Sequence, residues 1–183
     1  MVQVNRKIVH TVFGATAERF PGRIAVRHAG RGVSYADLNR AGDEIAELLR
    51  AAGVGRDVIC GVVLESGIPY VAAIIGVMKA GGIFVPLDLS FPEKRIGYML
   101  QKTPPAFIIG GADFAGSGEL LSAAGFDHRG CPLVLIDDDL CPTLRKARAE
   151  GAGAPAAPPG AEAGALPDPD DSCYVMYTSG STG

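Results

Sequence analysis

Apolar and polar residues follow one another along the chain in short blocks that predict alternating helices and strands. Ile8 to Arg19 has apolar residues at helical spacing, and Pro21-Gly22 would end that helix. Ile24 to His28 has the composition of a strand, and the glycines of Gly30-Arg31-Gly32 predict a turn after it.

The next helix has the clearest signals. Ser34 and Asp37 have capping-box spacing, with Asp in place of the usual Glu, so each side chain can satisfy a free amide at the helix start. Gly53 supplies a stop. The apolar residues that recur at helical period between these ends are Leu38, Ile45, Leu48, Leu49 and Ala52.

Val58 to Leu64 is an almost continuous apolar run, which is typical of a strand buried on both faces of a parallel sheet. Pro69 opens an apolar helix that Gly81-Gly82 closes, and Pro92 opens another that Pro104-Pro105 breaks. Further strands are predicted at residues 83–85, 107–109, 133–137 and 173–177. This alternation predicts an α/β fold with a mainly parallel sheet flanked by helices.

The length of 183 residues suits one compact domain. Within it, 16 of the 21 residues from Gly151 to Asp171 are Ala, Gly or Pro, so we expect a flexible linker at residues 151–171.

Composition excludes several classes of partner. A net charge of −3 with no dense Lys/Arg cluster argues against nucleic acid. No apolar run approaches membrane-spanning length and the N-terminus lacks a signal peptide, so we expect no membrane partner and a cytoplasmic location. His128 and Cys131 have a possible ligand spacing but no second pair, so no metal site is predicted. We expect free, mostly buried thiols at Cys60, Cys131, Cys141 and Cys173.

The chain's candidate chemistry lies in its last six residues, which follow an apolar strand. Glycines let a backbone approach an anion closely, successive amides can surround it, and hydroxyls add donors. The sequence is not a Walker loop, because the Gly-Lys-Ser/Thr ending is absent. The alternative interpretation is a flexible Ser/Thr/Gly turn. The candidate phosphate-binding residues are Thr178, Ser179, Gly180, Ser181, Thr182 and Gly183.

Three stretches carry a resemblance to a known family; in chain order they are VSYADLN, MKAGGIFVPLDLSFPEKRIGYML and CYVMYTSGSTG. Together they resemble motifs of the adenylate-forming enzyme superfamily, in its nonribosomal peptide synthetase branch of amino-acid adenylation domains. CYVMYTSGSTG resembles the phosphate-binding core motif. VSYADLN resembles an earlier motif, with Asp37 in place of Glu. MKAGGIFVPLDLSFPEKRIGYML resembles the motif between them, with Met78 for Leu and Leu89 where Pro is frequent.

The resemblance implies that residues 1–183 are the N-terminal portion of the large AMP-binding domain. The implied reaction joins an amino acid to ATP as an aminoacyl adenylate and passes the acyl group to the phosphopantetheine thiol of a peptidyl carrier domain. By resemblance, Thr178 to Gly183 hold the β and γ phosphates, whereas the Mg²⁺ ligands and catalytic residues lie outside this sequence.

The upstream motifs have a mainly structural interpretation. Val85 and Leu87 are expected in the core, and Asp88 is expected to order a turn rather than do chemistry. Tyr35 and Leu38 are expected to pack the helix that follows Ser34.

Three alternatives stay open at this point. One is an acyl- or aryl-CoA ligase, which shares the phosphate loop. Another is a nicotinamide-dependent reductase, since Tyr98 and Lys102 have Tyr-x-x-x-Lys spacing; we expect instead that Tyr98 packs and Lys102 stays in water. The third is a non-catalytic truncated relic.

We expect the 183-residue chain by itself to form no adenylates, because the resemblance places the other working parts outside this sequence. The measurement is amino-acid-dependent ATP–pyrophosphate exchange by the purified chain, and detectable exchange would contradict the expectation.

Overall fold

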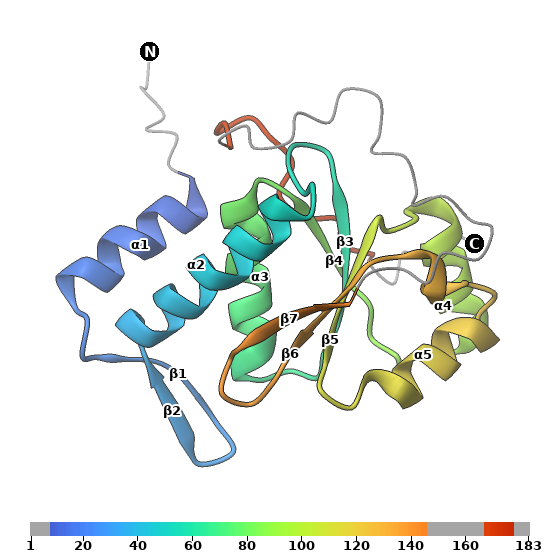
Figure 1. Cartoon of the computed structure of the whole chain (residues 1–183), viewed down its shortest axis with the longest axis horizontal. Helices are drawn as coiled ribbons and strands as arrows, with labels where there is room; N and C mark the ends of the chain where they lie inside the picture. Colours follow the sequence, from blue (N-terminus) through green and yellow to red (C-terminus); the bar gives the residue numbers. More distant parts are fainter. Residues whose placement is uncertain (1–7, 146–166, 178–183) are drawn as a thin grey trace.

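The computed structural model describes residues 8–145 and 167–177, which form two sheets and their flanking helices (Figure 1). The helices are α1 (Val9–Arg19), α2 (Tyr35–Ala51), α3 (Ile68–Ala80), α4 (Glu93–Lys102), α5 (Phe114–Ala123) and the 3₁₀ turn η1 (His128–Gly130). The strands are β1 (Ile24–His28), β2 (Arg31–Ser34), β3 (Ile59–Val63), β4 (Ile83–Pro86), β5 (Phe107–Gly111), β6 (Leu133–Ile136) and β7 (Pro142–Arg145).

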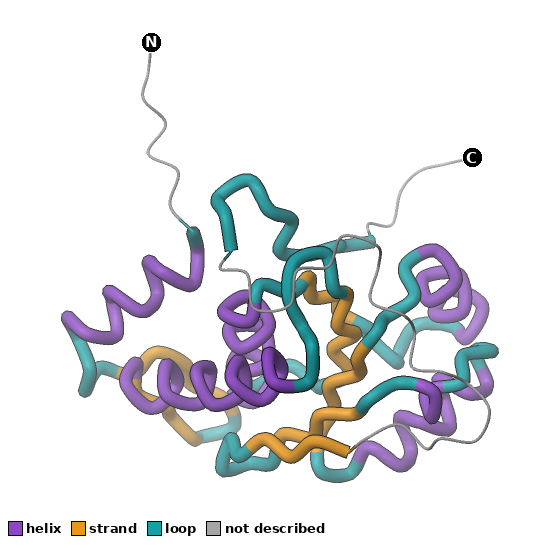
Figure 2. The backbone as a smooth tube through the Cα atoms, turned by 45° about the horizontal axis from the view of Figure 1, so that its top comes forward, coloured by secondary structure: helices purple, strands orange, loops and turns teal. Residues whose placement is uncertain are grey.

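The main sheet has five strands in the order β4-β3-β5-β6-β7. Its first four strands are parallel, and β7 pairs antiparallel with β6. The strands run through the middle of the molecule, with α2 and α3 on one side and α4 and α5 on the other (Figures 1 and 2). This arrangement confirms the α/β fold with a mainly parallel sheet.

Burial on both faces explains why the strands are continuous apolar runs. Phe107 and Ile109 of β5 pack into the core under α2 and α3, whereas Ile108 between them packs into the core under α4 and α5. Successive side chains of a strand point to opposite faces, so a strand covered by helices on both faces needs apolar residues at every position. Val62 and Val63 of β3 divide between the same two cores.

Helix α2 begins as predicted, but its cap is only half of a capping box. The Asp37 amide donates to the Ser34 hydroxyl at 3.1 Å. The Ser34 hydroxyl in turn donates to the Asp37 carboxylate at 2.6 Å, so this carboxylate satisfies no backbone amide there. The prediction that the Asp37 side chain also accepts from a free backbone amide was therefore wrong. The side chain of Asp is one methylene shorter than that of the Glu that usually stands at this position. The Ser34 hydroxyl, followed by Arg40, lowers the pKa of Asp37.

The β1–β2 hairpin differs from the predicted turn. The turn residues are Ala29 and Gly30, both with positive φ, and Arg31 already begins β2. Two residues with positive φ match the right-handed twist of the paired strands, which is why the turn is this short.

Helix α5 and strand β7 were not predicted either. The α5 sequence contains two glycines and two serines, which are weak helix formers. The helix forms because Phe114 and Leu121 are buried against the sheet, a contribution that local sequence does not reveal.

Helices α2 and α3 approach closely because each presents a glycine to an isoleucine of the other. A Cβ on Gly42 would lie 2.6 Å from Ile75 Cγ2, and a Cβ on Gly76 would lie 2.6 Å from Ile45 Cβ. Both isoleucines are buried, Ile45 completely. The two helices therefore fit together only while both positions lack a side chain.

None of the described helices is both long and apolar enough to cross a membrane.

We predict that Gly76→Ala lowers the free energy of unfolding by about 1–3 kcal/mol, because the new methyl group overpacks the contact with Ile45. Helix propensity alone would favour alanine by up to about 1 kcal/mol, so the sign of the change identifies the cause. The measurement is urea denaturation followed by circular dichroism.

Gly116→Ala in α5 is the matched control, because a Cβ there meets nothing within 4 Å. We expect this variant to be as stable as the parent or up to about 1 kcal/mol more stable. Equal stability of Gly76→Ala and the parent would show that the α2–α3 contact is not as tight as described.

Candidate functional site

The carboxyl ends of the parallel strands meet at one edge of the sheet, and an open cleft of about 650 Å³ lies there. The loop after β3 contributes Glu65 and Ser66, the loop after β4 contributes Asp88 and Ser90, and α3 contributes Tyr70. Ligands of open α/β sheets bind beyond the carboxyl ends of the strands, so this edge is the first place to expect one.

Asp88 orders the loop after β4, as predicted. Its Oδ1 accepts a hydrogen bond from the Ser90 amide at 2.9 Å, which is an Asx-turn. Hydrogen bonds from Ser90 lower the pKa of Asp88, so the group is a carboxylate near neutral pH. Burial, followed by the charge of Asp88, raises the pKa of Tyr70 across the cleft. Val85 and Leu87 are buried, which confirms their predicted place in the core.

The chain returns to this sheet at Pro167–Tyr177. The Phe84 amide of β4 donates to the Cys173 carbonyl and the Val175 amide donates to the Phe84 carbonyl, both at 3.1 Å. Tyr174 and Phe84 form one parallel bridge, so the strand predicted at 173–177 is confirmed only in part. Residues of the segment alternate between exposed and partly buried, as in a strand. The segment therefore runs beside β4 in the same direction as the parallel strands.

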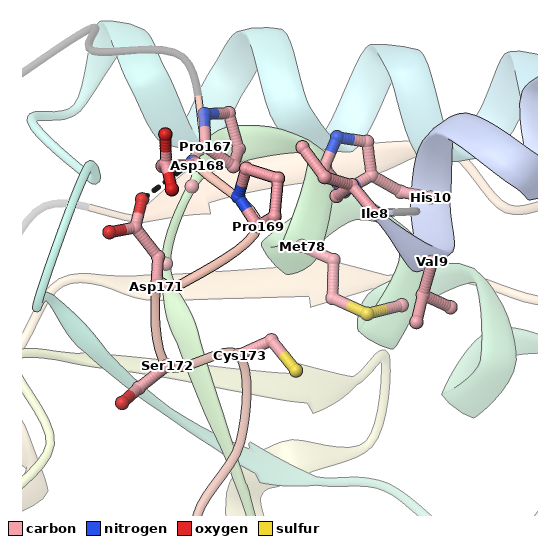
Figure 3. A pocket seen from close by; sticks show the side chains of 12 residues that line it. Ile8, Val9, His10, Met78, Pro167, Asp168, Pro169, Asp171, Ser172 and Cys173 are labelled. Atoms are coloured by element: carbon pink, nitrogen blue, oxygen red, sulfur yellow. Dashed lines mark hydrogen bonds between the residues drawn. The ribbon is translucent and has the colours of Figure 1, made fainter. Parts of the chain in front are cut away.

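The start of this returning segment is held by charged side chains. Arg56 Nε lies 3.1 Å from Asp171 Oδ1 in an ion pair, although it makes no hydrogen bond to any described residue. The Asp168 amide donates to Asp171 Oδ2 at 2.7 Å and closes a turn (Figure 3). These contacts hold the start of the returning segment beside the residues that precede β3.

A small cavity of about 100 Å³ lies between this segment, the start of α1 and the end of α3 (Figure 3). His10, Met78 and Cys173 line it. Burial, followed by the charge of Lys79, lowers the pKa of His10, so the imidazole is neutral near pH 7. A cavity of this volume has room for ordered water.

The six predicted phosphate-binding residues, Thr178, Ser179, Gly180, Ser181, Thr182 and Gly183, lie outside the described residues. What the structure describes is the segment that leads to them, and it ends at Tyr177.

The two upstream motifs contact each other through a lysine that sequence reasoning missed. Lys79 Nζ donates to Asn39 Oδ1 at 2.8 Å and to the Asn39 carbonyl at 3.3 Å, and it lies 2.6 Å from Asp43 Oδ1. Only 11% of the Lys79 side chain is exposed. Lys79 thus ties α3 to α2. The only sequence signal for the contact was that Asn39 and Lys79 belong to two motifs of one family.

The structural interpretation of the first motif is confirmed. Leu38 is completely buried, and the Tyr35 ring lies 5.7 Å from that of Phe13.

Tyr98 and Lys102, the pair with the Tyr-x-x-x-Lys spacing of a reductase, are both exposed on α4. Lys102 Nζ lies 5.8 Å from the ring centroid of Tyr98, so the two do share a helix face. The prediction that Tyr98 packs is confirmed only in part: its ring meets that of Tyr177 edge-on at 6.4 Å, while 54% of the residue is exposed.

The cysteines are free thiols, with Cys60 and Cys131 buried, Cys173 half-buried and Cys141 exposed. Burial raises the pKa of Cys60 to about 12, so this thiol is not a nucleophile at neutral pH. The Cys131 thiol donates to the Pro105 carbonyl. No group of three potential metal ligands occurs in the part of the chain that the structure describes.

Comparison with known proteins places these features in a family. The model of the family "AMP-binding enzyme" matches residues 13–183. Tyrocidine synthase 1 of Brevibacillus parabrevis is 32% identical over 97% of this chain and 14% of its own length. AMB antimetabolite synthetase AmbB of Pseudomonas aeruginosa is 36% identical over 98% of this chain and 13% of its own length. The chain thus spans about one seventh of these relatives.

The same match appears among solved structures. The crystal structure of the nonribosomal peptide synthetase FmoA3 in its AMPPNP-bound form superimposes with a TM-score of 0.68 at 27% identity, over 94% of this chain and 16% of that one. Because the family model covers the chain from within α1 to Gly183, and so includes all three motifs, this chain belongs to the family of AMP-binding enzymes.

Proposed function

We propose that this chain is part of an enzyme that activates an amino acid with ATP and passes it to a carrier-bound thiol. The observation that carries the proposal is the family match, which extends to residue 183 and therefore includes the hexapeptide Thr178–Gly183. The relatives at 32% and 36% identity are a tyrocidine synthase and an antimetabolite synthetase, and the solved structure at 27% identity is a nonribosomal peptide synthetase, which supports the amino-acid branch over the acyl- or aryl-CoA ligases.

Within that reaction, Thr178 to Gly183 hold the β and γ phosphates of ATP. Backbone amides and hydroxyl groups are the donors that such a loop offers, and each bond to a charged oxygen contributes about 1.5–3 kcal/mol. The position of Cys173–Tyr177 beside β4 supports this role, since a segment parallel to β4 runs toward the ligand-binding edge of the sheet.

The reaction itself has two steps. A carboxylate oxygen of the amino acid attacks the α-phosphorus of ATP, and the bond to the bridging oxygen breaks to release pyrophosphate. The phosphopantetheine thiol of a peptidyl carrier domain then displaces AMP from the aminoacyl adenylate and forms a thioester. The contribution of this chain is to orient the phosphates, which lowers the entropic cost of the first step.

Mg²⁺ neutralises phosphate charge in reactions of this type. As the family resemblance implies, its protein ligands are proposed to lie outside residues 1–183.

On this proposal, residues 1–183 form the N-terminal portion of the adenylation domain, with a linker at 151–171. The Arg56–Asp171 ion pair supports placing the end of that linker at the entrance to β3.

We predict that the intact protein catalyses ATP–pyrophosphate exchange that depends on an amino acid, and that Thr182→Ala raises the KM for ATP at least tenfold. Loss of a hydrogen bond to a charged oxygen corresponds to a factor of roughly 10 to 150. The measurement is exchange of labelled pyrophosphate at varied ATP.

Ser172→Ala is the matched control, because Ser172 is exposed and lies before the strand-like residues. It should leave the KM for ATP within about twofold, as expected for a surface substitution. Exchange that depends on a carboxylic acid without an amino group would support the acyl- or aryl-CoA branch instead. No exchange with any of the common amino acids would count against the proposal.

A further inference from the structure

Tyr177, the last described residue before the hexapeptide, is attached to α4 through its side chain. Its hydroxyl lies within hydrogen-bond distance of the Thr103 hydroxyl and 3.3 Å from the Met99 carbonyl. Thr103 precedes Tyr177 by 74 positions and ends α4 as its C-cap residue. A distant element therefore contacts the segment at the residue next to Thr178.

The donors and acceptors of this contact can be assigned. A carbonyl accepts only, so the single hydroxyl proton of Tyr177 goes to Met99. The Thr103 hydroxyl must then donate to the Tyr177 oxygen. The Met99 carbonyl also accepts the Thr103 amide at 2.8 Å, so both bonds of Tyr177 end on the last turn of α4.

The α4 end of the contact is well fixed. Met99 is buried in the core under α4 and α5, and Pro104-Pro105 follows Thr103 directly with restricted φ. On the other side, Val175 and Tyr177 pack against that same core, and the Tyr98 ring meets the Tyr177 ring edge-on at 6.4 Å.

Between Tyr177 and β4 the backbone contact is short. Among the described residues of β4, Phe84 alone bonds to the segment, through the Cys173 carbonyl and the Val175 amide, so the two residues after Val175 have no described ladder bond. At Tyr177 the hydrogen bonds to Thr103 and Met99 therefore take the place of ladder bonds, beside the packing of its ring.

We propose that Thr103 and Tyr177 are positioning residues for nucleotide binding: their hydrogen bond holds the chain at Tyr177, the residue that precedes the proposed phosphate-binding residues, so that affinity for ATP depends on Thr103. This rests on the function proposed above for Thr178–Gly183. Neither hydroxyl acts on the reacting atoms.

The first experiment follows the contact itself by hydrogen–deuterium exchange in the intact protein without nucleotide. Thr103→Val keeps the shape of the side chain and removes its hydroxyl, so the Val175 amide, which donates to the Phe84 carbonyl, should exchange about five- to tenfold faster. Thr103→Ser keeps the hydroxyl and should restore the parent rate. An unchanged rate in Thr103→Val would overturn the proposal, whatever the catalytic activity.

The second experiment follows the consequence in the pyrophosphate-exchange assay. Thr103→Val and Tyr177→Phe should each raise the KM for ATP about five- to tenfold and leave the KM for the amino acid unchanged. The double variant should lose less than the product of the two single effects, because both remove the same bond. Tyr174→Phe is the matched control: its ring packs on Phe84, its side chain is 53% exposed, and it should behave like the parent.

The outcomes separate the two proposals. A parent protein that shows no exchange contradicts the proposed function, while hydrogen–deuterium exchange still decides whether Thr103 holds Tyr177. A parent that is active, with an unchanged KM for ATP in Thr103→Val, overturns the positioning role. A Thr103→Val variant that unfolds at a lower temperature but keeps the parent's KM for ATP also overturns the positioning role, because the hydrogen bond then contributes only to stability.

Discussion

The close contact between α2 and α3 is the constraint on which the rest of the described structure depends. Gly42 and Gly76 let Ile75 and Ile45 pack against the opposite backbone. That contact sets the distance of both helices from one face of the sheet. Helix α3 connects β3 to β4, so its position also sets where these neighbouring strands pair and where their carboxyl ends meet.

Charge reinforces the same contact. The Lys79 ammonium, almost fully covered, is satisfied by the Asn39 amide oxygen and the Asp43 carboxylate. A covered ammonium without such partners would be costly, so the three polar residues specify how α3 lies along α2. Two of the three motifs that identify the family thus meet at a structural contact away from the cleft, whereas the third includes the chain's candidate chemistry.

The returning segment links this scaffold to function. It is attached at three places along its length: the ion pair of Arg56 and Asp171, the bridge of Tyr174 to Phe84, and the hydrogen bonds of Tyr177. Each attachment uses a different part of the preceding chain: the loop before β3, strand β4 and the end of α4. In the proposed function the residues after Tyr177 act by positioning phosphates. The three attachments order the chain up to Tyr177.

The sequence by itself determined the elements that have strong local signals and the family. Val58–Leu64 reads as a buried strand because both of its faces need apolar residues, and glycines mark the ends of α2 and α3. Tertiary structure alone decided the strand order, the helix α5, the edge strand β7 and the partners of Lys79 and Tyr177. The physical reason is distance along the chain: periodicity and caps act over a few residues, whereas Tyr177 and Thr103 meet across 74 positions only once the core has packed.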